Sequence, residues 1–500
     1  MATIETDRPG TVQGEVRMLI DGELVEAASG KRFDNINPAT EEVLGEVADA
    51  SADDMQLAIA AARRAFDETD WSTNHAFRKQ CLLQLHEAIV SEQEELRHEL
   101  VAEVGCPIAL TYGPQLDAPL SDALTWPAEF IDRFEWRREL PDGHAFGGHS
   151  KRWVVREAAG VVGAIVPWNY PFEVSSQKVG QALATGNTVI LKPAPDTPWN
   201  ATRLGRLVAE KTDIPAGVFN VVTSSDHLVG EELTTSPLVD LISFTGSTAT
   251  GKRIFEKGGA TMKRLFLELG GKSADIVLDD ADLEAKMGVA CMVAVHGGQG
   301  CVMPTRMLVQ RSVYEKAIEI ATPGFENFPY GDPNDMGNLM GPLVSAKQRD
   351  RVLGYIEKGR AEGARVVAGG GRPEQFDKGW FVQPTLFADV TNDMTIAREE
   401  IFGPVLIVIP FDGDDDAVRL ANDNQYGLGG YVTSGSFERA EAIGKRLRAG
   451  TISLNGGGQY GADAPFGGYK ASGVGRQNGI EGFQQYTEVK TYAAGVPATE

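Results

Sequence analysis

Residues 238–253 read Leu-Val-Asp-Leu-Ile-Ser-Phe-Thr-Gly-Ser-Thr-Ala-Thr-Gly-Lys-Arg. The apolar run over 238–244 predicts a buried strand, the glycine that follows predicts a turn, and the residues after Ser247 predict a helix. The chain before it alternates in the same way: strands are expected at 160–166, 188–191 and 218–222, and helices from 172 and over 198–211. Strands alternating with helices predict βαβ units and a parallel sheet, an α/β fold.

The glycine turn at 246–252 has the spacing Gly-x-x-x-x-Gly-Lys of a phosphate-binding loop. The next residue should carry a hydroxyl that binds magnesium, but it is Arg253, which disfavours a nucleoside triphosphatase. What is left is a set of backbone N–H groups at the positive end of a helix, suited to a pyrophosphate. An ordinary strand–turn–helix corner is the alternative. No Gly-x-Gly-x-x-Gly follows an early strand, so the usual dinucleotide fingerprint is missing.

Further organisation is expected on both sides of this region. The segments 53–66 and 75–104 have helical patterning. A second mixed α/β block extends from about residue 267 to 470, so a domain boundary is expected near 267.

Composition limits the possible partners. The chain has 500 residues, and 47 basic minus 70 acidic residues give a net charge of −23, which disfavours nucleic acid and anionic membranes as partners. Four cysteines make no disulfide framework, and the seven histidines form no zinc pattern, so no metal is expected. No apolar run approaches the roughly 18 residues of a membrane span, and a cytoplasmic location is expected.

Three residues could carry chemistry. Cys301 lies in Gly298-Gln-Gly-Cys and would need surroundings that lower its thiol pKa; an inert buried cysteine is the alternative. Glu268 lies in an apolar run, where burial would make it a general base unless it is ion-paired. Asn169, at a strand's end, offers an amide donor to an oxyanion or serves a turn. His296 is read mainly as a packing residue.

Together these pieces resemble the aldehyde dehydrogenase superfamily from about Met18 to Tyr492. The motifs follow the family's order along the chain: Asn37-Pro-Ala-Thr, Pro167-Trp-Asn-Tyr-Pro, Gly186-Asn-Thr-Val-Ile-Leu-Lys-Pro, Phe244-Thr-Gly-Ser-Thr, Leu267-Glu-Leu-Gly-Gly-Lys, Gly298-Gln-Gly-Cys, Glu399-Glu-Ile-Phe-Gly-Pro, and Pro465-Phe-Gly-Gly-Tyr-Lys leading into Ser472-Gly-Val-Gly-Arg. One such motif would be weak evidence, whereas the ordered set is specific.

The resemblance implies a fold with three parts and a homodimer or homotetramer. A Rossmann-like cofactor domain is expected over 18–137 and 159–266, an α/β catalytic domain over 267–477, and a small β oligomerisation arm over 138–158 and 478–497.

The resemblance also implies roles for individual residues. Cys301 resembles the nucleophile, Asn169 and the Cys301 N–H the oxyanion hole, and Glu268 the base that activates water. Lys178 matches a lysine implicated in proton relay, with a surface helix lysine as the alternative. The residues expected to bind the cofactor are Ile165, Pro167, Trp168, Lys192, Gly246, Ser247, Leu269, Glu400 and Phe402.

Three departures from the family pattern concern the cofactor and a proton relay. Ala194-Pro195 replaces the Ser-Glu of many NAD-preferring members, and without that glutamate NADP stays open. No new arginine beside it attracts a 2′-phosphate, so NAD is favoured. Ser224-Ser225-Asp226 replaces a glycine-rich turn, which puts the adenine pocket in doubt. Gln477 replaces a glutamate, which puts a proton relay there in doubt.

The expected aldehyde tunnel is mixed in character, with Glu173 adding polarity. Its predicted lining residues are Tyr170, Val174, Gln177, Val302, Tyr460 and Phe466. Aromatic walls favour a medium-chain, aromatic or terpenoid aldehyde. A semialdehyde or betaine-aldehyde-type dehydrogenase is the alternative, although no arginine cluster and no aromatic box is visible. A cofactor-independent cysteine esterase is a further alternative. Glu268 argues against the CoA-acylating kind, which needs no water-activating base.

Overall fold

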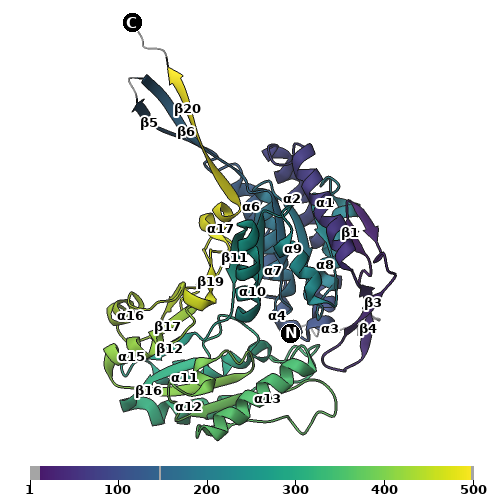
Figure 1. Ribbon diagram of the computed structural model, residues 1–500. Helices are drawn as coiled ribbons and strands as arrows, with labels where there is room; N and C mark the ends of the chain where they lie inside the picture. Colours follow the sequence, from purple (N-terminus) through teal and green to yellow (C-terminus); the bar gives the residue numbers. More distant parts are fainter. Residues whose placement is uncertain (1–11, 146–147, 497–500) are drawn as a thin grey trace, which may run out of the picture.

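The computed structural model describes residues 12–145 and 148–496 (Figure 1). An eight-stranded sheet has the order β19-β11-β10-β7-β8-β9-β1-β2, and its five inner strands are parallel. The inner strands are β7 (Val161–Ile165), β8 (Thr188–Lys192), β9 (Phe219–Val221), β10 (Leu241–Thr245) and β11 (Arg264–Glu268). Antiparallel edges are β1 (Met18–Ile20), β2 (Glu23–Val25) and β19 (Gly473–Val474).

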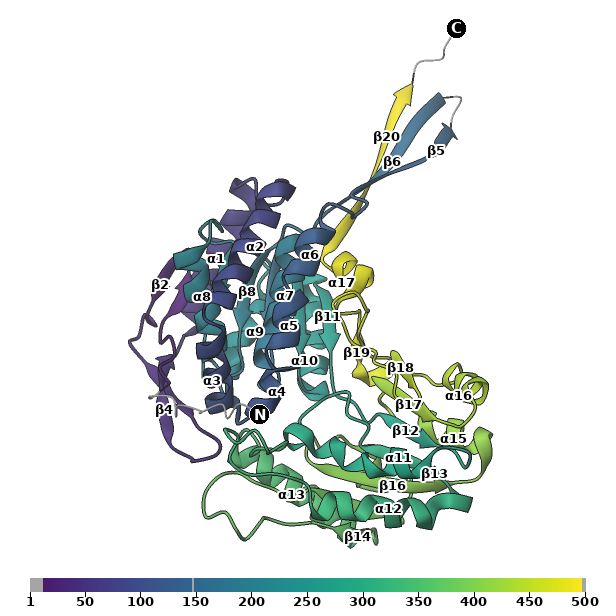
Figure 2. The same cartoon turned by 180° about the vertical axis from the view of Figure 1, so that it is seen from behind.

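Helices cover both faces of this sheet, because alternate residues of its inner strands are apolar on either side. Leu191 packs with α2 (His75–Ser91), α7 (Pro171–Ala184) and α8 (Trp199–Lys211), whereas Ile190 packs with α1 (Ala52–Glu68), α9 (His227–Thr235) and α10 (Thr248–Gly258). Figure 1 shows α9 and α10 on the near face, and Figure 2 shows α2 and α7 on the opposite one.

Two local expectations differ from the structure. The helix expected over 75–104 is two helices, because Glu92 leaves helical geometry between α2 and α3 (Gln93–Val104). The strand expected from Leu238 starts three residues later, because Leu238 is exposed and Asp240 instead accepts the Val161 N–H through its side chain.

A second sheet of seven strands lies below the first in Figure 1, with the order β14-β15-β16-β13-β12-β17-β18. Its strands are β12 (Ala274–Val277), β13 (Arg306–Gln310), β14 (Arg365–Ala368), β15 (Thr385–Ala388), β16 (Val405–Phe411), β17 (Gly429–Thr433) and β18 (Thr451–Leu454). Its helices are α11 (Leu283–Gly288), α12 (Tyr314–Glu326), α13 (Ala346–Ala361), α14 (Thr395–Arg398), α15 (Gly413–Asn422) and α16 (Phe437–Gly444). Separate apolar clusters fill its two faces.

The boundary expected at residue 267 falls inside β11, which pairs with β10 as far as Glu268. In addition, β19 joins the first sheet from within the segment expected to be catalytic. We propose that the chain divides after Glu268, with β19 returning to the first sheet.

A three-stranded arm projects from the body in both views (Figures 1 and 2). It consists of β5 (Arg137–Ala145), β6 (Gly148–Ala158) and β20 (Thr487–Val496), with β6 in the middle. Residues 146, 147 and 497 of the expected arm lie outside the described ranges. The expected second segment also contains α17 (Gly479–Gln485), whose Phe483 is buried in the body and not in the arm.

Smaller elements complete the described chain: β3 (Arg32–Ile36), β4 (Val43–Ala48), α4 (Ile108–Thr111), α5 (Asp117–Asp122), α6 (Thr125–Phe130), and 3-10 segments at 259–261, 290–298, 311–313 and 470–472. None of the helices in the described ranges is long and apolar enough to cross a membrane.

Candidate active site

A cavity of about 1090 Å³ lies between the two sheets, where the strands of the first sheet end. Every predicted site residue lines it except Lys178. We call one part of it the cofactor end, formed by the carboxyl ends of β7, β8 and β10, by α10 and by α13. The other part, the aldehyde end, is formed by Tyr170, Glu173, Val174 and Gln177 of the α7 region, together with Tyr460 and Phe466. Cys301, Glu268 and Asn169 also line the cavity.

Hydrogen bonds hold both the side-chain amide and the backbone carbonyl of Asn169. Its Nδ2 donates to the Gln299 carbonyl at 2.8 Å, which leaves the second amide hydrogen free. Its carbonyl accepts from Gln115 Nε2 at 2.9 Å and from His296 Nε2 at 2.8 Å. Burial lowers the pKa of His296 to about 4, so the ring is neutral, and the carbonyl acceptor requires the proton on Nε2. His296 is therefore a buried structural residue that positions Asn169.

The Cys301 thiol differs from the sequence expectation of a lowered pKa. Burial raises its pKa well above the usual range, and the nearby carboxylates Glu268, Glu400 and Glu173 raise it further. Negative charges close to a thiol oppose ionisation because they would repel the thiolate. The thiol is therefore protonated at neutral pH, and it needs a base close by before it can attack.

Glu268 ends β11 and is 4% exposed. Neither of its carboxylate oxygens has a hydrogen-bond partner within the described chain, and no ion pair involves it there. Burial raises its pKa to about 8, against the opposing effects of Lys178 and Arg476. A Cβ at Gly467 would lie 2.6 Å from Oε1, so only glycine lets the chain pass this close. The structure therefore removes the ion-paired alternative for this carboxylate.

Lys178 lies behind the cavity wall. It is fully buried on α7, its Nζ donates to Ser243 Oγ at 3.0 Å, and that hydroxyl contacts Tyr486 OH at 2.9 Å. Burial lowers its pKa to about 7, whereas the Glu268 carboxylate raises it. A surface helix lysine is therefore excluded.

The first turn of α10 forms part of the cofactor end. Ser247 caps the helix, because its Oγ accepts from the Thr250 N–H at 3.1 Å. At Gly246 a Cβ would lie 2.6 Å from Phe244 Cζ, so a larger residue would displace the wall. The helix N-terminus, a lining glycine and the nearby Lys192 give a site with the donors that a pyrophosphate requires.

Glu400 also lines the cavity, on the loop before β16. Its Oε1 accepts from the Gly271 N–H at 2.8 Å, and burial raises its pKa to about 7. Beside it Phe402 packs edge to face with Trp168, with ring centroids 5.4 Å apart. A carboxylate acceptor next to an aromatic wall fits a ribose hydroxyl and a flat ring.

The residues that depart from the family pattern form hydrogen bonds within the protein. Ser225 donates to Asp49 through its N–H at 2.8 Å, and Asp226 caps α9 by accepting the Leu228 N–H at 2.8 Å. Ser224, Ser225 and Asp226 do not line the cavity. Gln477 does line it; its Nε2 donates to Gln181 Oε1 at 2.8 Å.

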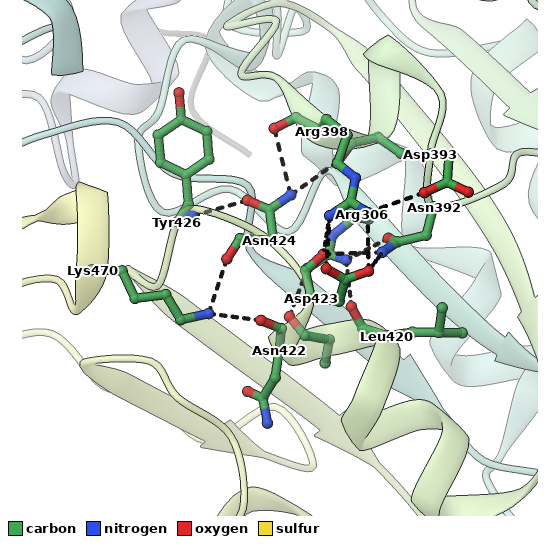
Figure 3. A network of polar contacts seen from close by, with 12 residues as sticks. Arg306, Asn392, Asp393, Arg398, Leu420, Asn422, Asp423, Asn424, Tyr426 and Lys470 are labelled. Atoms are coloured by element: carbon green, nitrogen blue, oxygen red, sulfur yellow. Dashed lines mark hydrogen bonds and ion pairs between the residues drawn. The ribbon is translucent and has the colours of Figure 1, made fainter.

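One polar network links three segments that carry site residues (Figure 3). Arg306, just beyond the cysteine loop, donates to Asn392 Oδ1 and to the Leu420 carbonyl. Arg398, just before Glu400, forms an ion pair with Asp423 at 2.9 Å. Lys470, just after Phe466, donates to the carbonyls of Asn422 and Asn424. The network therefore fixes these loops relative to one another.

Several further lining residues belong to none of the motifs that pointed to the site: Pro114, Asp196, Ser345, Lys347, Gln348, Arg351 and Gln459. Most come from α13 or from loops whose approach to the cavity depends on packing of the second sheet. Glu173 was detectable, since it lies one helical turn before Gln177.

The model of the aldehyde dehydrogenase family matches residues 24–492. The chain belongs to this family. It is similar to a Pseudomonas sp. 3-succinoylsemialdehyde-pyridine dehydrogenase, 42% identical over 476 residues that cover 94% of this chain and 97% of the relative.

Solved aldehyde dehydrogenases have the same fold. One is an NAD+ complex of a Bacillus cereus aldehyde dehydrogenase, with a TM-score of 0.92, 38% identity, and coverage of 97% of this chain and 98% of that one. Another is a Staphylococcus aureus betaine aldehyde dehydrogenase with NAD+, with a TM-score of 0.92, 34% identity, and coverage of 96% and 94%. The expected family, its α/β fold with a Rossmann-like sheet, and aldehyde dehydrogenase activity are thereby confirmed. In the described ranges no group of three or more metal-ligating side chains occurs.

Proposed function

We propose that this aldehyde dehydrogenase oxidises its substrate to a carboxylic acid through a covalent adduct on Cys301, with NAD as the cofactor. The observation that carries the proposal is the convergence of three groups on one cavity: a thiol, a clamped amide with a free N–H, and a buried carboxylate with no partner. Soft nucleophile, oxyanion donor and general base are the parts that acyl chemistry at a carbonyl needs.

Each residue acts at a stated atom. The Cys301 Sγ attacks the aldehyde carbon as a thiolate, and its proton passes to a base, for which Glu268 has the proximity and a suitable pKa. The Asn169 Nδ2 and the Cys301 N–H stabilise the oxygen of the thiohemiacetal. After oxidation to the thioester, and once Glu268 has released the thiol proton to solvent, Glu268 takes a proton from the water that attacks the carbonyl. It returns this proton to the Cys301 sulfur as the acid leaves.

The cofactor would bind at the cofactor end. Gly246 and Ser247 would hold its pyrophosphate, Lys192 and Glu400 would hold its two riboses, and the walls would be Ile165, Pro167, Trp168, Leu269 and Phe402. The bound nicotinamide supplies the acceptor for the hydride. NAD is favoured over NADP because Asp196 and Glu231 line this end, and Arg253 is already ion-paired with Glu231 at 2.6 Å. Both similar solved structures named above contain NAD+.

For the substrate, the tunnel walls support an aldehyde with an extended carbon chain or a ring. Tyr460 packs edge to face with Phe466, with centroids 5.3 Å apart, and with Tyr170, Val174, Gln177 and Val302 it borders the aldehyde end. A medium-chain, aromatic or terpenoid aldehyde would lie on these walls. The names of the relatives keep semialdehydes and betaine aldehyde as alternatives.

The arm supports a homodimer or homotetramer. Both outer strands, β5 and β20, have one unpaired edge in the described chain, and long free edges readily pair with a second chain. Light scattering on the purified protein would test the assembly, and a monomer would refute it. We propose a cytoplasmic location, since the four cysteines are free thiols.

The reaction is tested by reduced-cofactor formation from an aldehyde panel, with NAD and NADP in turn, for the wild type and Cys301→Ala. Turnover in the variant should fall roughly a thousandfold or more, because the covalent route is lost. Cys291→Ala is the matched control, since that thiol lies outside the cavity, and its turnover should be unchanged. Turnover that survives Cys301→Ala would refute the proposal.

A further inference from the structure

The two ends of the cavity carry different charges. All lysines and arginines that line it belong to the cofactor end: Lys192, Arg253, Lys257, Lys347 and Arg351. The residues of the aldehyde end include no lysine or arginine within the described chain. The cations match an anionic cofactor, so the charge of the other end must concern the aldehyde.

Glu173 is the carboxylate at the aldehyde end. It lies in the first turn of α7, on the same helix as Gln177, and forms no ion pair within the described residues. The carboxyl interacts with the Tyr460 hydroxyl and is close enough to Cys301 to affect the thiol's pKa. Asp122 adds a second negative charge near it, and burial together with Asp122 raises the pKa of Glu173 to about 8.

This arrangement discriminates among substrates by charge. An anionic aldehyde would meet Glu173 and Asp122 with no compensating cation, which is unfavourable. A neutral chain would shield the Glu173 carboxyl from solvent and offer it no partner beyond the Tyr460 hydroxyl. A cation would counteract this raised pKa by stabilising the ionised carboxylate, and in a desolvated site the pairing is stronger than in water.

We propose that Glu173 selects aldehydes that carry an ammonium group at the end remote from the carbonyl. This inference rests on the proposed function, in which Cys301 reacts with the carbonyl. The ammonium group donates hydrogen bonds to the Glu173 carboxylate. Gln177 Nε2 donates to Tyr460 OH at 2.8 Å, so the lone pairs of Gln177 Oε1 can accept a second ammonium hydrogen. The aromatic walls accommodate the methylene chain between the two ends.

The test compares kcat/KM for aminopropanal and aminohexanal with that for butanal and heptanal, in which a methyl group replaces the ammonium group. Succinate semialdehyde is the anionic probe. The wild type should prefer at least one amino-aldehyde over its neutral counterpart by roughly tenfold or more, mainly through KM, and should use the anion least. A wild-type preference for both neutral alkanals would overturn the inference.

Glu173→Gln keeps the size and polarity of the side chain and removes its charge. Its preference for the amino-aldehyde over the matched alkanal, taken as the ratio of the two kcat/KM values, should fall roughly tenfold. Glu129→Gln removes the same charge from an exposed position outside the cavity and should keep the wild-type preference. A Glu173→Gln enzyme that still prefers the ammonium substrate would overturn the inference.

Competitive inhibition tests the same inference with the wild-type enzyme alone. Pentylammonium should compete with heptanal in the wild type, whereas pentanoate should not, and the reverse order would overturn the inference. Failure of the proposed function looks different, since then neither alkanals nor amino-aldehydes would give Cys301-dependent reduced cofactor. Oxidation of alkanals without any ammonium preference would refute the role of Glu173 alone.

Discussion

The cofactor end and the aldehyde end are parts of one cavity, but the fold builds them by different means. At the cofactor end, a capped helix, strand ends and a glycine turn supply backbone groups and cations. At the aldehyde end, side chains of α7 and of the segment around Tyr460 supply aromatic walls and a carboxylate. Backbone groups suit a cofactor shared across a family, whereas side chains can change with the aldehyde. Substitutions at the cofactor end should therefore alter other kinetic constants than substitutions at the aldehyde end.

The largest effect is expected where the two ends of the cavity meet. Asn169→Ala removes the side-chain donor to the oxyanion, so kcat should fall by about a hundredfold to a thousandfold. Cofactor affinity, measured by fluorescence titration, should change little. Asn334→Ala, at an exposed position outside the cavity, is the control. An unchanged kcat would remove Asn169 from the oxyanion site.

Glu400→Gln probes the cofactor end alone. Glutamine keeps the acceptor for the Gly271 N–H but removes the charge that would face a ribose. The KM for the cofactor should rise roughly tenfold, with the KM for the aldehyde unchanged. Steady-state kinetics with each substrate varied in turn checks this. Equal rises in both constants would show that the two ends are not separable.

The pH profile probes the base between the ends. A general base acts in its ionised form, and burial raises the pKa of Glu268 to about 8. When release of the acid limits turnover, kcat should therefore rise with pH through an inflection near 8. In Glu268→Gln that inflection should be absent. The same inflection in both enzymes would assign it to another group.

Lys470→Met should have the smallest effect on catalysis, and it should affect the cofactor end and the aldehyde end equally. It removes the donor to the carbonyls of Asn422 and Asn424 in the network of Figure 3. Loss of these bonds should lower the free energy of unfolding by about 1–3 kcal/mol, measured by urea denaturation. Both KM values should shift slightly and together. A large change in only one would tie Lys470 to that end.

The sequence predicted much of this site because the family motifs lie at strand ends and turns. Gly246 and Ser247 follow a strand whose apolar run was readable, so their place at the end of that strand was predictable. Glu268 was recognisable as a carboxylate in an apolar run. The raised pKa of the Cys301 thiol was not, because it depends on carboxylates brought together by three distant segments. Nor was the position of α13 at the cavity, which depends on packing of the second sheet.

Two further differences have local causes. The split of the expected helix at Glu92 gave no clear sequence signal, since glutamate is a good helix former. The partners of Arg306 could not be predicted either, because they come from residues 392 and 420, far along the chain. The sequence identified Glu173 as polar but could not show that it has no cationic partner.

The central claim is that Cys301 carries the acyl group and Glu268 releases it. The most direct measurement mixes Glu268→Gln with saturating NAD and aldehyde, follows reduced cofactor on the millisecond scale, and examines the quenched protein by mass spectrometry. The account predicts a burst stoichiometric with enzyme, followed by slow turnover, and an acyl adduct on the peptide that contains Cys301. Steady turnover at the wild-type rate with no adduct, or an adduct on another residue, would contradict it.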